Sequence, residues 1–145
     1  MNIKPSSKVI FYSIERAIKE YRKFAQKSIS AKINDITVDQ GLVLSFLNNY
    51  PELSQKEIAK MMFRDNASMT RMIDLMVKKG YLERSMNDKD RRRHTIEITD
   101  NGKQILEELP PVISSNRKIA LKGITNEEIE QLEKTLGKII SNCTQ

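Results

Sequence analysis

Residues 54–99, SQKEIAKMMFRDNASMTRMIDLMVKKGYLERSMNDKDRRRHTIEIT, contain the pattern that decides the fold. Ser54 and Glu57 have the spacing of a capping box and predict a short helix. Asp65 and Ser68 are both suitable N-terminal residues for a second helix, because their side chains can accept hydrogen bonds from free backbone N–H groups. The apolar residues of this second helix recur at i, i+3, i+4 and i+7, as Met69, Met72, Ile73 and Met76.

The pattern changes after Gly80, which predicts the end of the second helix because glycine readily adopts the left-handed conformation. Residues 81–84 and 95–99 then form two short runs that are typical of β-strands. The residues between them include the polar tip 87–90. The sequence therefore predicts a β-hairpin directly after the second helix.

Two helices are predicted before this stretch. The first is a long amphipathic helix that Ser6 or Ser7 can cap and that runs to about residue 31. The second begins at a capping box, Thr37-Val38-Asp39-Gln40. Its strongly apolar sequence ends before Pro51, because the residue before a proline disfavours helical backbone angles.

Two more helices are predicted after the hairpin. Thr99 or Asp100 can cap the first of them, which Pro110 and Pro111 interrupt or kink because proline lacks the backbone N–H group. A further capping box at Thr125 opens the last helix. The expected order is four helices, a hairpin and two helices, which is a mainly α fold with a small β-hairpin.

The short helix, the turn, the longer helix and the hairpin follow the order of a winged helix-turn-helix, which we expect over residues 36–100. In such a unit the second helix, here residues 66–78, enters the major groove of DNA. Because the methionine stripe faces inward, the side chains predicted to contact DNA from this helix are Asn66, Ser68, Thr70 and Arg71.

Arg71 is the residue on this helix that can pair bidentately with guanine or clamp a phosphate. Asp74 follows three residues later. The alternative interpretation is therefore that Arg71 and Asp74 form only an ion pair on the helix surface.

A basic run follows the predicted hairpin tip, where three arginines, Arg91, Arg92 and Arg93, are consecutive. On a regular strand Arg91 and Arg93 point to one face and Arg92 to the other. One face can then enter a minor groove while the other reaches phosphate. Asp88 or Asp90 can hold an arginine in place. The alternative is that the run is only a solvated loop.

The composition excludes several classes of protein. The 145 residues carry 25 Lys and Arg against 19 Asp and Glu, and this net charge of +6 suggests a polyanionic partner. Cys143 and His94 are the only cysteine and histidine, which are too few for a protein-only zinc site, so we expect no metal and no cofactor. Charges interrupt every apolar run near the N-terminus, so we expect no membrane span and a cytoplasmic protein.

Two other functions were weighed against DNA binding. Five scattered glycines form no phosphate-binding loop and no catalytic triad can be assembled, so we do not expect an enzyme. Winged helices also serve as protein docking modules. Docking, however, does not require three consecutive arginines beside a polar helix face.

Two stretches resemble the MarR family of bacterial and archaeal transcriptional regulators. Residues 84–92, RSMNDKDRR, are similar to the wing pattern R-x-x-D-x-x-D-R-R, although Asn87 stands where the family usually has the first Asp. Residues 69–74, MTRMID, and 78–84, KKGYLER, are similar to the recognition-helix patterns T-R-L-V-D and K-K-G-L-V-x-R. The resemblance covers essentially the whole chain, residues 1–145. It implies DNA contacts for Ser68, Thr70, Arg71, Arg91 and Arg92, with Asp90 as the supporting acid of the wing.

The terminal helices, residues 6–32 and 101–143, are longer and more apolar than a lobe of this size needs for its cover. We expect them to form the dimerisation region of a two-fold homodimer, which would bind a pseudo-palindromic operator in double-stranded DNA. A monomer with these helices folded back is the alternative. The resemblance implies interleaved terminal helices and a repressor that responds to a small aromatic effector bound between the dimer helices and the DNA-binding lobe.

Five aromatic residues could line an effector pocket, and we expect most of them to pack in the core instead: Phe11, Tyr12, Tyr21, Phe24 and Phe46. Redox sensing is not expected of Cys143, because no basic residue lies next to it in the sequence to activate its thiol. For His94, which follows the wing arginines, we expect a surface or strand position rather than a ligand role.

Overall fold

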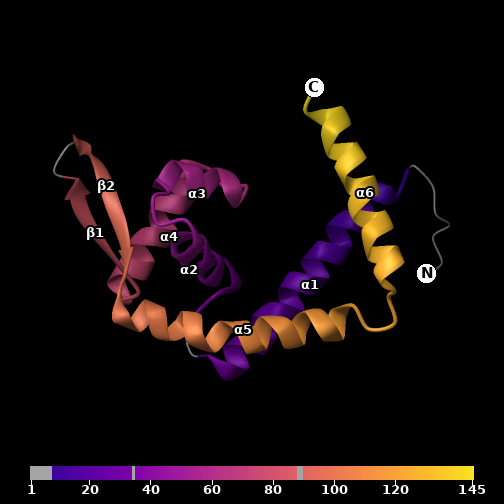
Figure 1. The fold of residues 1–145 in the computed structure, drawn as a ribbon, viewed down its shortest axis with the longest axis horizontal. Helices are drawn as coiled ribbons and strands as arrows, with labels where there is room; N and C mark the ends of the chain where they lie inside the picture. Colours follow the sequence, from indigo (N-terminus) through magenta and orange to yellow (C-terminus); the bar gives the residue numbers. More distant parts are fainter. Residues whose placement is uncertain (1–7, 34, 88–89) are drawn as a thin grey trace.

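The computed structural model describes residues 8–33, 35–87 and 90–145, without the side chains of residues 86–94. Its helices and strands are α1 (Ile10–Lys32), α2 (Val38–Asn49), α3 (Gln55–Met61), α4 (Asn66–Lys78), β1 (Leu82–Asn87), β2 (Asp90–Ile98), α5 (Asp100–Ala120) and α6 (Asn126–Cys143). The predicted order of elements and the mainly α winged helix-turn-helix class are confirmed (Figure 1).

The chain divides into a lobe and an arm in Figure 1. We use "lobe" for α2, α3, α4 and the β1–β2 hairpin, and "arm" for α1, α6 and the end of α5 that leads to α6. Helix α5 runs beneath the lobe and continues into the arm, while α6 stands apart from the lobe. Contacts of α1 with both α2 and α5 join the two parts.

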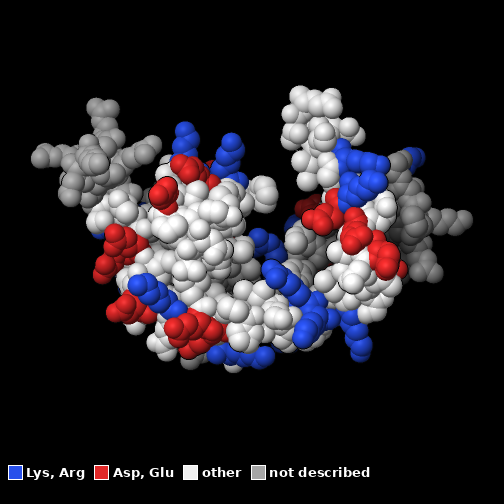
Figure 2. All heavy atoms as spheres, viewed as in Figure 1, with Lys and Arg blue, Asp and Glu red and all other residues white. Residues whose placement is uncertain are grey.

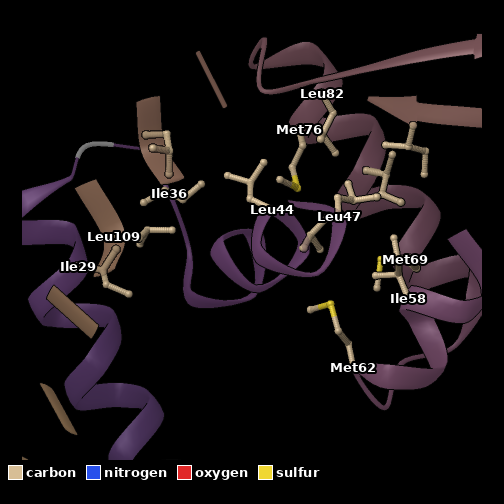
Figure 3. Close-up of a cluster of buried hydrophobic side chains, with 14 of the residues drawn as sticks. Ile29, Ile36, Leu44, Leu47, Ile58, Met62, Met69, Met76, Leu82 and Leu109 are labelled. Carbon is tan, nitrogen blue, oxygen red and sulfur yellow. The ribbon is translucent and has the colours of Figure 1, made fainter. Parts of the chain in front are cut away.

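The core of the lobe forms around α2. Val43 and Leu44 are completely buried, and one continuous cluster of apolar side chains extends from them to α1, α3, α4, the hairpin and α5. Figure 3 shows Leu44 between Ile36 and Leu109 on one side and Met76 on the other. Because every element of the lobe contributes to this cluster, the position of α4 is set by the same packing that stabilises the fold.

Each helix from α2 to α6 begins at a side-chain cap. Thr37 and Thr125 form the predicted reciprocal capping boxes with the residues three positions later. Asp65 is the cap of α4. At α3 the prediction is correct only in part: the Ser54 hydroxyl accepts from the Glu57 N–H group, but it also donates to the Glu57 carboxylate, which replaces the reciprocal bond.

Helix α1 differs from the prediction at its start and on its surface. It begins after Val9, which makes no side-chain cap bond, and Ser6 and Ser7 lie outside the described residues. The expectation of core packing is wrong for Phe11 and Tyr12, which are 63% and 60% exposed. Phe24 is also exposed, whereas Tyr21 is half-buried and Phe46 packs against the core. Exposed aromatic rings therefore remain on α1 in the single chain.

Helix α5 is continuous through Pro110 and Pro111, so the expected interruption is not found. Both prolines are exposed, which leaves water free to bond the carbonyl groups that lose their helical partners. On the opposite face Leu109 and Val112 are buried against the core. This packing maintains helical geometry where local propensity opposes it.

The hairpin is longer than predicted. Strands β1 and β2 pair regularly from Leu82 with Ile98 to Met86 with His94. The next pair is Asn87 with Asp90, so residues 91–93 lie within a register irregularity. Regular alternation therefore does not extend through the three arginines, and the predicted directions of their side chains, which are not described, stay a prediction.

None of the helices within the described ranges is both long enough and apolar enough to cross a membrane. The long helices α1 and α5 both carry several charged residues along their length. Their apolar faces are therefore stripes rather than complete apolar surfaces.

Gly102 joins the hairpin to α5 by close packing. A methyl group at this position would lie 2.5 Å from the Tyr81 carbonyl oxygen and 2.7 Å from Ile98 Cγ2. The Thr99 hydroxyl strengthens the same junction, because it accepts from the Gly102 N–H group at 3.1 Å and donates to the Gly80 carbonyl at 2.5 Å. The wing and α5 therefore meet without a flexible linker.

We expect Gly102→Ala to lower the free energy of unfolding by about 1–3 kcal/mol, because the added methyl group overpacks this junction. Urea denaturation followed by circular dichroism measures the change. Gly137→Ala in α6 is the matched control, since a methyl group there meets no atom within 4 Å. The control should raise stability by about 0.5–1 kcal/mol through its higher helix propensity. Equal effects of the two substitutions would contradict the packing argument.

Candidate DNA-binding surface

The rotation of α4 about its axis is fixed by its apolar face. Met69, Ile73 and Met76 are completely buried, and Met72 is half-buried, as the sequence predicts. Arg71 lies on the opposite side and is exposed. The buried methionines are core residues, so the outward face of α4, which is polar apart from the exposed Leu75, is free to meet another molecule.

One edge of this face is held by Gln55, the first residue of α3. Gln55 Nε2 donates to Thr70 Oγ1 at 2.6 Å and to Asn66 Oδ1 at 3.2 Å. Gln55 Oε1 accepts from Arg84 of β1 at 3.2 Å, and Arg84 also pairs with Asp74 of α4. Hydrogen bonds thus link α3, α4 and the base of the wing.

The other edge is held by Asp39 at the start of α2. Asp39 Oδ1 accepts from Arg22 of α1 at 2.8 Å, and Asp39 Oδ2 pairs with Arg64 in the turn before α4. Arg64 also donates to Ser68 Oγ at 2.8 Å. A chain of charged and polar groups therefore runs from the arm through the lobe to the first turn of α4.

Asp39 remains ionised in this setting. Burial by itself raises the pKa of the carboxyl, but hydrogen bonds and charge attraction from Arg22 and Arg64 outweigh burial and lower the pKa below its ordinary value. The Asp39 side chain is only 14% exposed, so solvent screens these interactions weakly.

Arg71 does not form the ion pair with Asp74 that was the alternative interpretation. Among the described ion pairs Asp74 is joined to Arg84 instead, and none involves Arg71. Arg71 borders an open cavity of about 690 Å³ between α1, α2 and α4. The other charged residues around this cavity are Arg22, Lys23, Asp39 and Arg64. The Arg71 guanidinium is therefore available to an anionic partner.

Basic side chains also cover α3. Figure 2 shows Lys and Arg side chains projecting above this helix at the top of the lobe. Lys56 and Lys60 are the exposed lysines of α3. They extend the positive surface from the start of α4 across the neighbouring helix, which suits a partner with a continuous run of negative charges.

The wing residues fall largely outside the description. The backbone of Arg91, Arg92 and Arg93 lies in β2, which begins at Asp90, but the side chains of these four residues are not described. Asp88 lies outside the described residues altogether. Their predicted contacts therefore stay predictions.

The structure adds residues that the sequence analysis did not assign to the site. Asp39 was noted only as a member of a helix cap, and Gln55 and Arg64 were not singled out. The hydrogen-bond partners of Gln55 and Arg64 on other elements lie up to 29 positions away in the sequence. The helix-turn-helix spacing could have suggested Gln55, because it places the start of α3 beside the start of α4.

Within the described residues, no group of His, Cys, Asp or Glu side chains is arranged to hold a metal ion.

The packing of α3, α4 and the hairpin defines a winged helix-turn-helix DNA-binding protein. The sequence model of the MarR family matches residues 36–94. Wild-type apo MarR from E. coli has 26% identity and a TM-score of 0.74, over 95% of this chain and 98% of that chain. The MarR model thus covers the winged helix-turn-helix of this chain, and the chain is a DNA-binding transcriptional regulator of MarR type rather than an enzyme.

Two further structures share the fold. S. aureus MepR in a complex with DNA has a TM-score of 0.80 and 23% identity, over 96% of this chain and 100% of that chain. BpsR from Bordetella bronchiseptica, whose DNA binding is regulated by 6-hydroxynicotinic acid, has a TM-score of 0.81 and 21% identity, over 95% and 97% of the two chains. At these identities the likeness concerns the fold alone.

We expect Asp39→Asn to lower the free energy of unfolding at pH 7 by about 1–3 kcal/mol, because the substitution leaves two arginines without their charged partner. A carboxyl with a lowered pKa stabilises the fold above its unfolded-state pKa and loses that effect as the pH falls through its folded-state pKa. The difference between wild type and variant should therefore shrink below about pH 4. Urea denaturation from pH 7 to pH 2 measures it.

Glu15→Gln is the matched control for Asp39→Asn, since it removes a carboxylate from the exposed Glu15–Lys19 pair of α1. An exposed pair contributes about 0–1 kcal/mol, so the control should have little effect at any pH. A difference for Asp39→Asn that stays constant from pH 7 to pH 2 would contradict the assignment of the effect to the ionised carboxylate.

Proposed function

We propose that this regulator binds a pseudo-palindromic operator as a homodimer, with α4 in the major groove and the Arg-rich wing in the minor groove. The observation that carries the proposal is the outward polar face of α4, whose opposite face is buried and whose two edges are held by Gln55 and Asp39. The proposed DNA-contacting residues are Asn66, Ser68, Thr70, Arg71, Arg91, Arg92 and Arg93, with Asp88 and Asp90 supporting the wing.

The hydrogen bonds of α4 suggest separate roles for its residues. Arg64 donates to the Ser68 oxygen, so the Ser68 hydroxyl proton is free to be donated to a phosphate. Arg71 is exposed and makes no described ion pair, so its guanidinium can donate two parallel bonds to guanine. Ser68 would then position the helix on the backbone while Arg71 reads a base.

The homodimer is supported by the exposed apolar surface of the arm. No residue of α6 is buried, although the helix is amphipathic. Large apolar side chains are exposed along the arm: Ile10, Phe11, Ile18, Ile119, Leu132 and Ile140. Apolar area of this extent is normally buried by a partner. In a two-fold dimer the arms would bury one another, and residues 6–32 and 101–143 would form the dimerisation region around two lobes of residues 36–100.

A response to a small aromatic effector is supported by a second cavity of about 250 Å³ between α1, α2 and α5. Its walls are mainly apolar, and they include Tyr21 and the buried Asn116. The described hydrogen bonds include none to the Asn116 amide, which is therefore available to a polar substituent on an aromatic ring. A ligand here would contact the arm and the lobe together, which suits a ligand-responsive repressor.

Arg71→Ala should weaken operator binding by about 1–3 kcal/mol and relax the base preference at one position of each half-site. The operator is obtained by selecting fragments from a random DNA library with the purified protein, and affinities are measured over a series of salt concentrations. Lys103→Ala is the control, because it removes one positive charge from α5, on the side of the lobe away from α3 (Figure 1). It should leave both properties nearly unchanged.

Two outcomes would count against this assignment of α4. If the wild-type protein selects no sequence, the proposal of an operator is wrong. If Arg71→Ala keeps both the affinity and the sequence preference of the wild type, α4 does not read DNA through Arg71.

The combined substitutions Leu132→Glu and Ile140→Glu should convert a dimer into a monomer, because they place charges on the apolar face of α6. Sedimentation equilibrium should give twice the chain mass of 16.8 kDa for the wild type and about this mass for the variant. Lys134→Glu with Ser141→Glu places charges on the same helix away from its apolar stripe and should remain dimeric. A monomeric wild type at micromolar concentration would refute the homodimer.

A further inference from the structure

The amide of Gln55 has a fixed orientation because of Arg84. Arg84 donates to one end of the Gln55 amide at 3.2 Å, and a guanidinium group has only donors. The end that faces Arg84 must therefore be the carbonyl oxygen, and the amide nitrogen must face α4. Asp74, which accepts from Arg84, keeps the guanidinium in this place.

This orientation determines which side-chain atoms of Asn66 and Thr70 on α4 donate hydrogen bonds and which accept them. Gln55 Nε2 uses its two protons for Thr70 Oγ1 and Asn66 Oδ1. Thr70 gives its only hydroxyl proton to the backbone carbonyl oxygen of Asn66 at 2.9 Å, so its oxygen accepts from Gln55. Asn66 has to present Oδ1 to Gln55, and both protons of its Nδ2 remain available to a partner of the exposed face.

The orientation of the Asn66 amide limits the bases that it can recognise. Asparagine pairs bidentately with adenine when Oδ1 accepts from N6 and Nδ2 donates to N7. Asn66 can complete this pair only through the second lone pair of Oδ1, because Oδ1 already accepts from Gln55. Cytosine offers a single donor and thymine a single acceptor in the major groove. Guanine offers two acceptors, N7 and O6, which match the two free protons of Nδ2 and ask nothing further of Oδ1.

We propose that Gln55 is a positioning residue that leaves the Nδ2 group of Asn66 as the free end of its amide, so that Asn66 favours guanine over adenine. The inference rests on the proposed function, because it requires the start of α4 to meet base edges in the major groove. Gln55 itself need not touch DNA, since it acts through Asn66.

The test compares the base preferences of the wild type, Q55E and Q55M by selection from a random DNA library and sequencing. Asn66→Ala first identifies the operator position that depends on Asn66. At this position the wild type should prefer guanine over adenine by about 5-fold or more. In Q55E the carboxylate has no proton to donate, so Asn66 must turn its Nδ2 inward and present Oδ1, and the preference should move to adenine or cytosine.

Q55M keeps the length of the side chain without its polar atoms. Asn66 is then free to turn, and the preference should fall to about 2-fold or less between guanine and adenine. Because Q55M adds no negative charge, it also tests the inference if Q55E binds DNA too weakly. Gln104→Glu on α5 makes the same charge change as Q55E and should leave the wild-type preference intact.

The possible results separate the inference from the proposed function. A wild type that selects no sequence overturns both. A wild type that selects an operator with adenine, cytosine or thymine at the Asn66 position overturns the inference alone. An unchanged preference in both Q55E and Q55M does the same, because the polarity of Asn66 would then not depend on Gln55.

Discussion

The burial of one face of α4 against α2 and α3 is the constraint on which the site depends. Met69, Ile73 and Met76 have no exposed surface, and a helix cannot rotate about its axis without withdrawing such side chains from the core. Because adjacent residues on a helix are 100° apart, fixing these three fixes the directions of Asn66, Thr70 and Arg71 as well. The apolar core therefore decides which polar groups face outward.

Polar contacts refine what the core sets. Asp39 and Gln55 hold opposite edges of α4, one through Arg64 and Ser68 and the other through Asn66 and Thr70. Their contacts join elements that are distant in the sequence, so they form only when the lobe is folded. Side chains that are already ordered lose little conformational freedom when they bind, which favours affinity and specificity. The structure thus presents a surface in which much of this ordering precedes any contact with DNA.

Local signals in the sequence were sufficient for most of the fold. Thr37, Asp65 and Thr125 begin helices as predicted, and the apolar spacing of α4 gives its inward face correctly. Pro110 and Pro111 were misjudged because tertiary packing at Leu109 and Val112 overrides a local preference. The exposed rings of Phe11 and Tyr12 were missed because amphipathic periodicity does not say which molecule will cover a helix face.

The candidate site was less accessible to sequence reasoning. The outward positions of Asn66 and Arg71 follow from helix periodicity. Whether Arg71 pairs with Asp74 was open, however, until the structure placed Asp74 beside Arg84. Gln55 and Asp39 were not assigned, because their roles depend on contacts between separate elements. Strand patterns and the order of elements predicted the wing, yet the irregular pairing of residues 91–93 is a property of the strand pair rather than of either strand.

The two prolines of α5 have a mechanical consequence. Pro110 and Pro111 remove two consecutive backbone hydrogen bonds from α5, which continues from beneath the lobe into the arm. A helix that lacks two consecutive backbone hydrogen bonds is least stiff at the place where they are missing. The Gly102 junction, by contrast, ties the first turn of α5 tightly to the wing. Bending of the arm against the lobe is therefore concentrated about two turns beyond the wing, and a small angular change there is magnified into a larger displacement at the tip of α6.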